Sequence, residues 1–130
     1  MIYPFMRKED NVRLIKLIAR TRKKDMEKVK KMLSNASYVN DQYIAISRSG
    51  DELHGFMFAT VEKFDEEFTA YIQYCYSTKR NDVQIMLDNL MDWAKTRGIS
   101  SMTFMTDRNA QGFERKYKFA EVYKVLKREI

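Results

Sequence analysis

The sequence predicts an α+β fold in which a mixed, mostly antiparallel sheet packs against helices. Three observations predict it. Apolar residues recur at helical spacing over residues 12–33, β-branched and aromatic residues dominate three segments between residues 43 and 76, and a second helical stripe over 83–94 precedes one more strand-like segment. With 130 residues, of which 45% are hydrophobic, the chain can form one compact domain, and we expect 1–130 to be that domain.

The first part of the chain predicts two helices. Apolar residues repeat at positions 12, 15, 17, 18 and 19, and again at 26, 29, 32 and 33. The polar run Arg20–Lys24 interrupts this stripe, and Thr21 is a candidate N-cap for the second helix. Ser34 and Asn35 should end that helix.

The middle of the chain predicts three antiparallel strands. They cover Tyr43–Ser47, Leu53–Val61 and Thr69–Tyr76. The first turn contains Gly50, which accepts a positive φ, and the second connection is the charged run Lys63–Glu67. These connections are short enough for hairpins.

The remaining elements alternate between helix and strand. An apolar stripe over 83–94 predicts a helix with Asp82 as its N-cap and Gly98 at its C-terminal end. The strand Ser101–Thr106 then follows a crossover and should run parallel to Thr69–Tyr76. A short helix at Ala110–Tyr117 and a last strand at Glu121–Arg128 complete the predicted order.

Composition argues against several classes of protein. Cys75 is the only cysteine and His54 the only histidine, so an internal disulfide is excluded and no zinc site or other metal site is expected. Apolar runs are too short for a membrane span, and Met1–Met6 is too short for a signal peptide. We therefore expect a cytoplasmic protein without a membrane partner.

The positive charge is concentrated in the N-terminal part. Residues 1–34 hold eleven Lys and Arg against four Asp and Glu, a net charge of +7, whereas the remainder holds thirteen against fourteen, a net charge of −1. A basic helical face can attract nucleic acid, an acidic protein or a phosphorylated ligand. It can equally be a solvated surface that keeps the protein soluble.

Two sequence segments carry a family resemblance. The segments LDNLMDWAKTRGISSMTF and NAQGFERKYKF, together with the order of elements, resemble the GNAT superfamily of N-acetyltransferases. The resemblance implies helices on both faces of the sheet, acetyl-CoA as the cofactor and transfer of an acetyl group to an amine. It covers most of the chain.

The resemblance also implies which residues hold the cofactor. These would be the backbone of the strand end Tyr74, Cys75 and Tyr76, the loop Thr78, Lys79, Arg80, Asn81, Asp82 and Val83, and Asn109 in the later segment. The family places phosphate-binding glycines in that loop, because glycine lets backbone N–H groups approach a diphosphate, and this loop has none. Lys79 and Arg80 could hold a diphosphate by side chain instead, whereas Asp82 as the helix cap would repel it.

Catalytic candidates follow from the later segment and from acid–base chemistry. The resemblance implies a tyrosine that protonates the leaving thiolate, a role open to Tyr117, while Glu114 stands where the family commonly has that tyrosine. Acetylation also needs a base for the amine, and the candidates besides Glu114 are Glu62, Glu66, Glu67 and His54. Each of these residues, Tyr117 included, can equally be an ordinary packing or surface residue, and Cys75 should be a buried small hydrophobe rather than a nucleophile.

The sequence leaves the function open between alternatives. The first is an acyl-CoA-dependent N-acyltransferase whose amine acceptor, a small molecule or a protein, is unknown. The second is a catalytically inactive binding or structural module with the same fold, whose basic N-terminal helices contact nucleic acid or an acidic partner. The third is an acyl-binding protein that takes a different thioester or a phosphorylated ligand, and the oligomeric state is open in every case.

Overall fold

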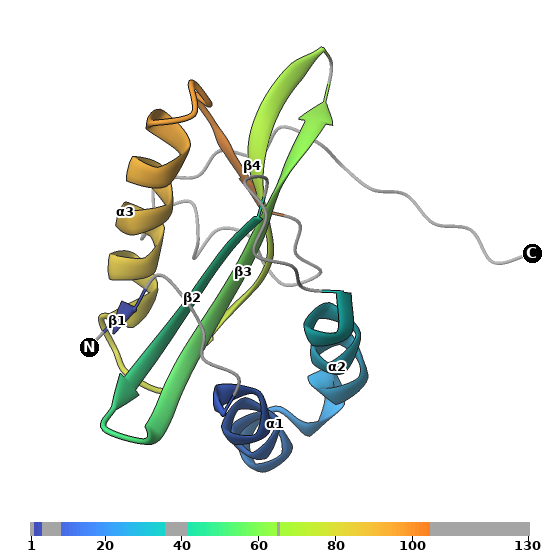
Figure 1. The fold of residues 1–130 in the computed structure, drawn as a ribbon, viewed down its shortest axis with the longest axis vertical. Helices are drawn as coiled ribbons and strands as arrows, with labels where there is room; N and C mark the ends of the chain where they lie inside the picture. Colours follow the sequence, from blue (N-terminus) through green and yellow to red (C-terminus); the bar gives the residue numbers. More distant parts are fainter. Residues whose placement is uncertain (1, 4–8, 36–41, 65, 105–130) are drawn as a thin grey trace, which may run out of the picture.

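The computed structural model describes residues 2–3, 9–35, 42–64 and 66–104, which form a five-stranded sheet with helices on both faces (Figure 1). The strands follow their sequence order in the sheet, β1-β2-β3-β4-β5. The elements are β1 (Ile2–Tyr3), α1 (Asp10–Thr21), the 3-10 turn η1 (Lys23–Asp25), α2 (Met26–Asn35), β2 (Gln42–Ser49), β3 (Glu52–Phe64), β4 (Glu67–Ser77), α3 (Asp82–Lys95) and β5 (Met102–Phe104).

The sheet is mixed, as the sequence predicts. Strands β1 to β4 pair antiparallel, and β5 pairs parallel to β4 after the crossover through α3. The three antiparallel strands, the long helix and the parallel strand are therefore confirmed. The two-residue strand β1 was not predicted, because two residues are too few to show a period.

Two separate apolar cores hold the layers together. On one face, α1 and α2 pack against the sheet through Leu14, Leu17, Ile18, Val29 and Met32, which meet Ile44, Ile46, Phe56, Phe58 and Tyr74. On the other face, α3 packs through Met86, Leu87, Leu90 and Ala94, which meet Tyr43, Met57, Ala59, Ala70 and Ile72. Figure 1 shows the two helical layers on opposite sides of the sheet, so the prediction of helices on both faces is confirmed.

In both hairpins the strands extend slightly beyond their predicted ends. Gly50 has φ +59° in the β2–β3 turn, which is the conformation that its position predicts. The β3–β4 connection is shorter than the predicted loop, because pairing continues to Phe64 opposite Glu67. Glu66 takes the left-handed conformation there, with φ +70°.

The C-terminal end of α3 is closed by the predicted glycine. Gly98 has φ +70° and its N–H donates to the Lys95 carbonyl at 3.0 Å, while the Ile99 N–H donates to the Ala94 carbonyl at 2.9 Å. These two bonds form the Schellman arrangement, which satisfies carbonyls left free at a helix end. Ile99 is then buried in the α3 core.

Two predicted N-caps are wrong. Thr21 is the last residue of α1, and its hydroxyl donates back to the Leu17 carbonyl at 2.7 Å instead of capping α2. Asp82 lies inside the first turn of α3, whose N-cap position is Asn81, and its carboxylate accepts a hydrogen bond from Ser77 at 2.7 Å. In both cases a nearby side-chain or carbonyl partner competes with the capping interaction.

The chain breaks between α1 and α2 at Arg22, whose φ of −144° and ψ of 54° are not helical. The two predicted N-terminal helices are thus confirmed, with η1 between them. The predicted helix Ala110–Tyr117 and strand Glu121–Arg128 lie outside the described residues. Within the described ranges, no helix is both long and apolar enough to cross a membrane.

Candidate functional site

A β-bulge in β4 determines which side chains face which helical layer. The register between β3 and β4 shifts after Phe58, which pairs with Tyr74, whereas Ala59 pairs with Ile72. Gln73 is therefore an extra residue in β4, and alternation reverses across it. Ile72 faces the α3 core, but Tyr74 faces the core under α1 and α2.

The described part of β5 pairs with the first part of β4. The parallel pairs join Ala70 to Met102, Tyr71 to Thr103 and Ile72 to Phe104, and β4 then continues to Ser77. Because β5 is described only as far as Phe104, what lies beside Tyr74, Cys75 and Tyr76 on that side is outside the described residues.

Ser77 organises the loop between β4 and α3. Its hydroxyl donates to Asp82 Oδ2 at 2.7 Å and accepts the Lys79 N–H at 3.0 Å. The Thr78 N–H donates to the His54 carbonyl at 2.8 Å, and the Asp82 N–H donates to the Lys79 carbonyl at 3.3 Å. These bonds hold residues 77–82 as a compact turn that leads directly into α3.

This turn does not need glycine for its conformation. Asn81 has φ −101°, and Glu66 is the only non-glycine residue with a positive φ in the described ranges. Side chains at 78–83 are therefore unstrained, although their Cβ atoms still limit how closely a phosphate can approach. Thr78, Lys79, Arg80 and Asn81 are exposed, while Asp82 and Val83 are half-buried.

The position of Asp82 leaves the N-terminal end of α3 open to a phosphate, because this side chain does not cap the helix. Its carboxylate is bonded to Ser77 rather than to the start of the helix, so it does not cap the helical N–H groups. Within the residues that the structure describes, the backbone N–H groups of Val83 and Gln84 have no hydrogen-bond partner. Free N–H groups and the helix dipole favour an anion there, although the carboxylate charge of Asp82 still opposes it.

Cys75 is not suited to nucleophilic chemistry. It is half-buried against the α3 core, and burial raises the pKa of its thiol from 9.0 to about 12. The thiolate, which is the reactive form, is therefore scarce at neutral pH. This agrees with the sequence-based expectation that Cys75 is a small hydrophobe.

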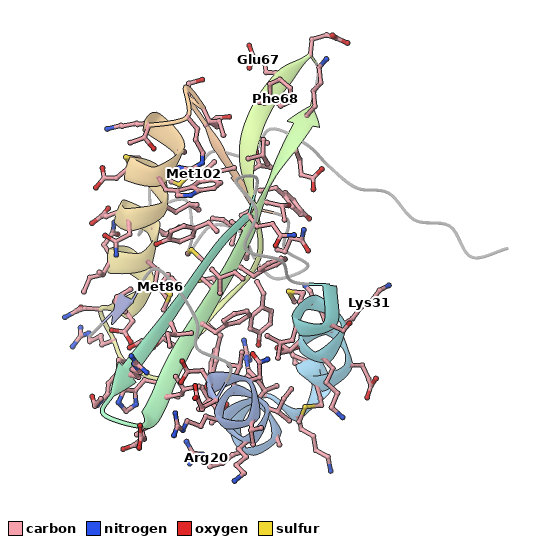
Figure 2. The ribbon with its side chains drawn as sticks, viewed as in Figure 1. Arg20, Lys31, Glu67, Phe68, Met86 and Met102 are labelled. Carbon is pink, nitrogen blue, oxygen red and sulfur yellow. The ribbon has the colours of Figure 1, made fainter. Side chains whose placement is uncertain are left out.

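Among the candidate bases, His54 is poorly placed. It is a buried bulge residue of β3, with Nε2 3.1 Å from the Ser49 hydroxyl. Glu66 and Glu67 are exposed at the β3–β4 hairpin, where Figure 2 shows Glu67 at the far tip. Glu62 is exposed and accepts a hydrogen bond from Thr60 at 2.9 Å, and Thr60 in turn accepts one from Gln73 at 2.9 Å. Of these four residues, only Glu62 is connected to the β4 bulge.

The other predicted site residues cannot be placed. Asn109, Glu114 and Tyr117 lie outside the described residues. Their assignment as cofactor-binding or catalytic groups stays a prediction. The described structure brings together the strand end Tyr74–Tyr76 and the loop at 78–83.

Sequence reasoning missed a charged cluster next to Tyr74 and Tyr76. The Tyr74 hydroxyl donates to Asp25 Oδ2 at 3.0 Å, and Lys28 Nζ lies 5.8 Å from the Tyr74 ring centroid. The Arg22 guanidinium lies 5.1 Å from the Tyr76 ring centroid. Burial, and then the bond to Asp25, raise the pKa of Tyr74 well above its ordinary value. Tyr74 and Asp25 are 49 residues apart, so no local sequence pattern signals this contact.

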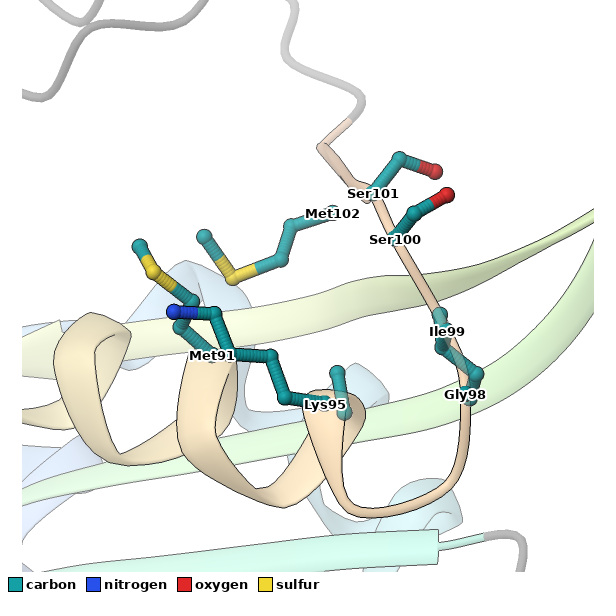
Figure 3. A pocket seen from close by; sticks show the side chains of 8 residues that line it. Met91, Lys95, Gly98, Ile99, Ser100, Ser101 and Met102 are labelled. Atoms are coloured by element: carbon teal, nitrogen blue, oxygen red, sulfur yellow. The ribbon is translucent and has the colours of Figure 1, made fainter.

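A pocket of about 500 Å³ lies between the C-terminal end of α3 and β5 (Figure 3). It is lined by Met91, Ala94, Lys95, Gly98, Ile99, Ser100, Ser101 and Met102. Because α3 has 14 residues and extends about 20 Å, this pocket lies far from the loop at 78–83. Lys95 is its single ionisable group among the described residues, so the pocket offers no acid–base pair.

Comparison with known proteins places this geometry in a known fold. No protein-family model matches the sequence, and no curated protein is significantly similar to it. Solved structures do match. A predicted acetyltransferase from Clostridium acetobutylicum, solved with acetyl-CoA, has a TM-score of 0.72 at 16% identity, covering 99% of this chain and 96% of that one.

Two further matches show how widely the fold is used. Glucosamine-6-phosphate N-acetyltransferase from Arabidopsis thaliana has a TM-score of 0.71 at 13% identity, with 99% and 97% of the two chains covered. A transcriptional regulator from Bacillus halodurans has a TM-score of 0.76 at 15% identity, with 100% and 99% covered. The chain therefore has the fold of the GNAT acetyltransferases, and at these identities the likeness shows the fold alone.

Proposed function

We propose that the protein is an acyl-CoA-dependent N-acyltransferase that uses acetyl-CoA and an amine acceptor. The observation that carries this proposal is the turn at 77–82, which leads from the strand end Tyr74–Tyr76 directly into α3 and, within the described ranges, leaves the N–H groups of Val83 and Gln84 without a partner. The acyl and pantetheine part of the cofactor would bind along the backbone of Tyr74–Tyr76. The acetyl-CoA present in the Clostridium acetobutylicum relative supports the choice of cofactor.

The diphosphate would bind at the start of α3. The N–H groups of Val83 and Gln84 would receive it from the backbone, and the exposed cations Lys79 and Arg80 would hold it from the side. These side chains would replace part of the close backbone contact that glycines give in related enzymes. Asn109 is proposed as a further cofactor contact.

The chemistry would be direct transfer. The free amine attacks the thioester carbonyl, the new N–C bond forms, the C–S bond breaks, and the CoA thiolate leaves. A base must take a proton from the amine and an acid must protonate the thiolate. Tyr117 is proposed as the acid and Glu114 as the base, with Glu62 as the alternative base because of its link to the bulge.

The test is calorimetric titration of the protein with acetyl-CoA and with CoA. We expect a dissociation constant in the micromolar range. Replacing both Lys79 and Arg80 with Ala should weaken binding by about tenfold or more, because charge-assisted bonds to a phosphate are among the stronger polar interactions. Lys30→Ala is the matched control, since Lys30 is an exposed cation on α2 rather than at the start of α3.

Asp82→Asn is a second variant, and it should change the affinity for acetyl-CoA in the opposite direction. It keeps an acceptor for the Ser77 hydroxyl but removes the negative charge beside the helix start, so it should tighten acetyl-CoA binding. No binding of either ligand at millimolar concentration would contradict the proposed function.

That negative result would favour the alternative, an inactive module that binds a polyanion. The observation in its favour is a set of exposed cations on α1, η1 and α2, none of which forms an ion pair within the described ranges. They are Lys16, Arg20, Lys23, Lys24, Lys28, Lys30 and Lys31. Nucleic acid binding that is lost steeply with added salt would support it, and failure to bind nucleic acid at low salt would remove it.

A further inference from the structure

A group of two cations, two tyrosines and one carboxylate joins η1 and α2 to the end of β4. We call Arg22, Asp25, Lys28, Tyr74 and Tyr76 the η1 cluster. Asp25 is its only acidic residue, and Lys23 and Lys24 are exposed beside it in η1. The η1 cluster therefore carries a net positive charge on the strand segment where the thioester is proposed to bind.

Within the described ranges, the Arg22 guanidinium does not use all of its hydrogen-bond donors. Among the residues that the structure describes, its buried Nε has no hydrogen-bond partner, and the Asp25 carboxylate oxygen Oδ2 lies 3.8 Å away. That separation is too long for a hydrogen bond. A buried donor without an acceptor is unfavourable, so an incoming acceptor oxygen would be favoured there.

Solvent can reach the η1 cluster. The side chains of Arg22 and Asp25 are 26% and 23% exposed, and Lys28 is exposed. Arg22 lies over the Tyr76 ring and Lys28 near the Tyr74 ring, so the two tyrosines hold the cations at the sheet surface. Tyr74 is fixed in turn by its bond to Asp25 and by the core.

We infer that the amine acceptor carries an anionic group, a phosphate or a carboxylate, which binds to Arg22 and Lys28 of the η1 cluster. This inference rests on the proposed transferase function. Arg22 presents a planar guanidinium that matches both kinds of anion, and Lys28 adds a second positive charge. The surrounding unpaired cations of α1 and α2 would draw such an acceptor toward the site; Figure 2 shows Arg20 and Lys31 on the outer sides of these helices.

The acceptor's amine would then lie near β4, while its anionic group contacts η1. A neutral amine of the same shape would lose the contacts with Arg22 and Lys28. It should bind more weakly by about tenfold, because a hydrogen-bonded charge pair contributes more than a neutral one. The η1 cluster would thus select acceptors by charge and leave the cofactor site unchanged.

The experiment compares matched probes that differ in one charged group. Glucosamine 6-phosphate is titrated against glucosamine, and the dipeptide Ala-Glu against Ala-Gln, first by NMR chemical shifts without cofactor and then by CoA release with acetyl-CoA. The first pair tests a phosphate and the second a carboxylate. We expect the anionic member of at least one pair to bind about tenfold more tightly.

Three variants test whether Arg22 and Lys28 cause the preference for the anionic probe. Arg22→Gln with Lys28→Gln should abolish the preference for the anionic probe and leave acetyl-CoA affinity within about twofold, whereas Lys30→Gln with Lys31→Gln should preserve the preference. Asp25→Asn retains an acceptor for the Tyr74 hydroxyl and removes the competing charge, so it should strengthen binding of the anionic probe. This increase is a result that a merely structural role for Asp25 does not predict.

Equal binding of the charged and neutral members of both pairs would overturn the inference. So would a preference that survives the Arg22 and Lys28 changes, or a loss of anion binding in Asp25→Asn. Failure of acetyl-CoA to bind would contradict the proposed transferase instead, and the titrations without cofactor distinguish the two failures.

Discussion

At the residue scale, position 55 requires glycine because it lies in close contact with the turn before α3. A Cβ atom at this position would lie 2.6 Å from Ser77 Cβ, 2.7 Å from Ser77 Oγ and 2.8 Å from the Tyr76 carbonyl oxygen. These distances are shorter than normal contacts between such atoms. Gly55 therefore lets β3 approach the end of β4, where the turn at 77–82 begins.

Gly55→Ala should lower the free energy of unfolding by about 1–3 kcal/mol, since backbone and side chain must both move to admit a methyl group. Because the shift displaces Ser77, it should also weaken the proposed binding of acetyl-CoA. Urea denaturation and calorimetry measure the two effects. An unchanged midpoint in Gly55→Ala would show that the turn is not tightly packed.

At the scale of elements, a buried carboxylate links α1 to the β2–β3 hairpin. Asp10 is completely buried in the first turn of α1, 3.4 Å from Arg13 and 3.7 Å from the nearly buried Arg48 of β2. Arg13 also reaches Asp51 in the hairpin turn, at 3.5 Å. This network positions the start of α1, and through it η1, against the sheet.

Asp10→Ala should destabilise the fold by about 3–5 kcal/mol, because it removes a completely buried carboxylate from between Arg13 and the nearly buried Arg48. Asp51→Ala is the matched control: it removes a carboxylate from the same network whose side chain is 78% exposed, and should change stability by less than about 1 kcal/mol. Thermal or urea unfolding measures both. Equal effects of the two changes would mean that burial does not determine the strength of the network.

The elements also show what local sequence can predict. The stripe of α3 and the alternation in β2–β4 predicted those elements to within about three residues at each end, because burial on one face imposes a period. The caps at Thr21 and Asp82 were wrong, since Leu17 and Ser77 offer competing partners. The bulge at Gln73 leaves no compositional signal, yet it determines which face Tyr74 occupies.

The candidate site was predictable only where it is continuous in sequence. The strand end at 74–76 and the turn at 78–83 follow one another, so the family resemblance could indicate both. The η1 cluster depends on side-chain contacts between η1, α2 and β4, which form only when the two layers pack together. Long-range contacts of this kind require the structure.

At the scale of the whole molecule, both apolar cores bury groups that ionise at alkaline pH. Burial raises the pKa of Tyr43 and of Cys75 to about 12 in the core under α3, and raises that of Tyr74 in the core under α1 and α2. The ordinary values are 9.0 for the thiol and 10.0 for the phenols. In the unfolded chain these groups therefore lose their protons at lower pH than in the folded protein.

Stability should consequently fall as the pH rises. A raised folded-state pKa contributes stability that is fully present below the unfolded pKa, and this contribution is lost as pH rises through the folded pKa. The window is from about pH 9 to about pH 12, set by the ordinary and raised values of Cys75 and Tyr43. Urea midpoints across this range should decrease in the parent protein.

Tyr43→Phe isolates one of these groups. The Tyr43 hydroxyl is buried and has no hydrogen-bond partner in the described ranges, so its removal should leave stability at pH 7 unchanged or slightly higher. The same change should make stability fall less steeply above pH 10, because one group no longer ionises on unfolding. Tyr74→Phe is the contrasting variant: it loses the bond to Asp25 and should be less stable already at pH 7. If Tyr43→Phe and the parent protein lose stability equally between pH 10 and 12, ionisation of Tyr43 does not drive alkaline unfolding.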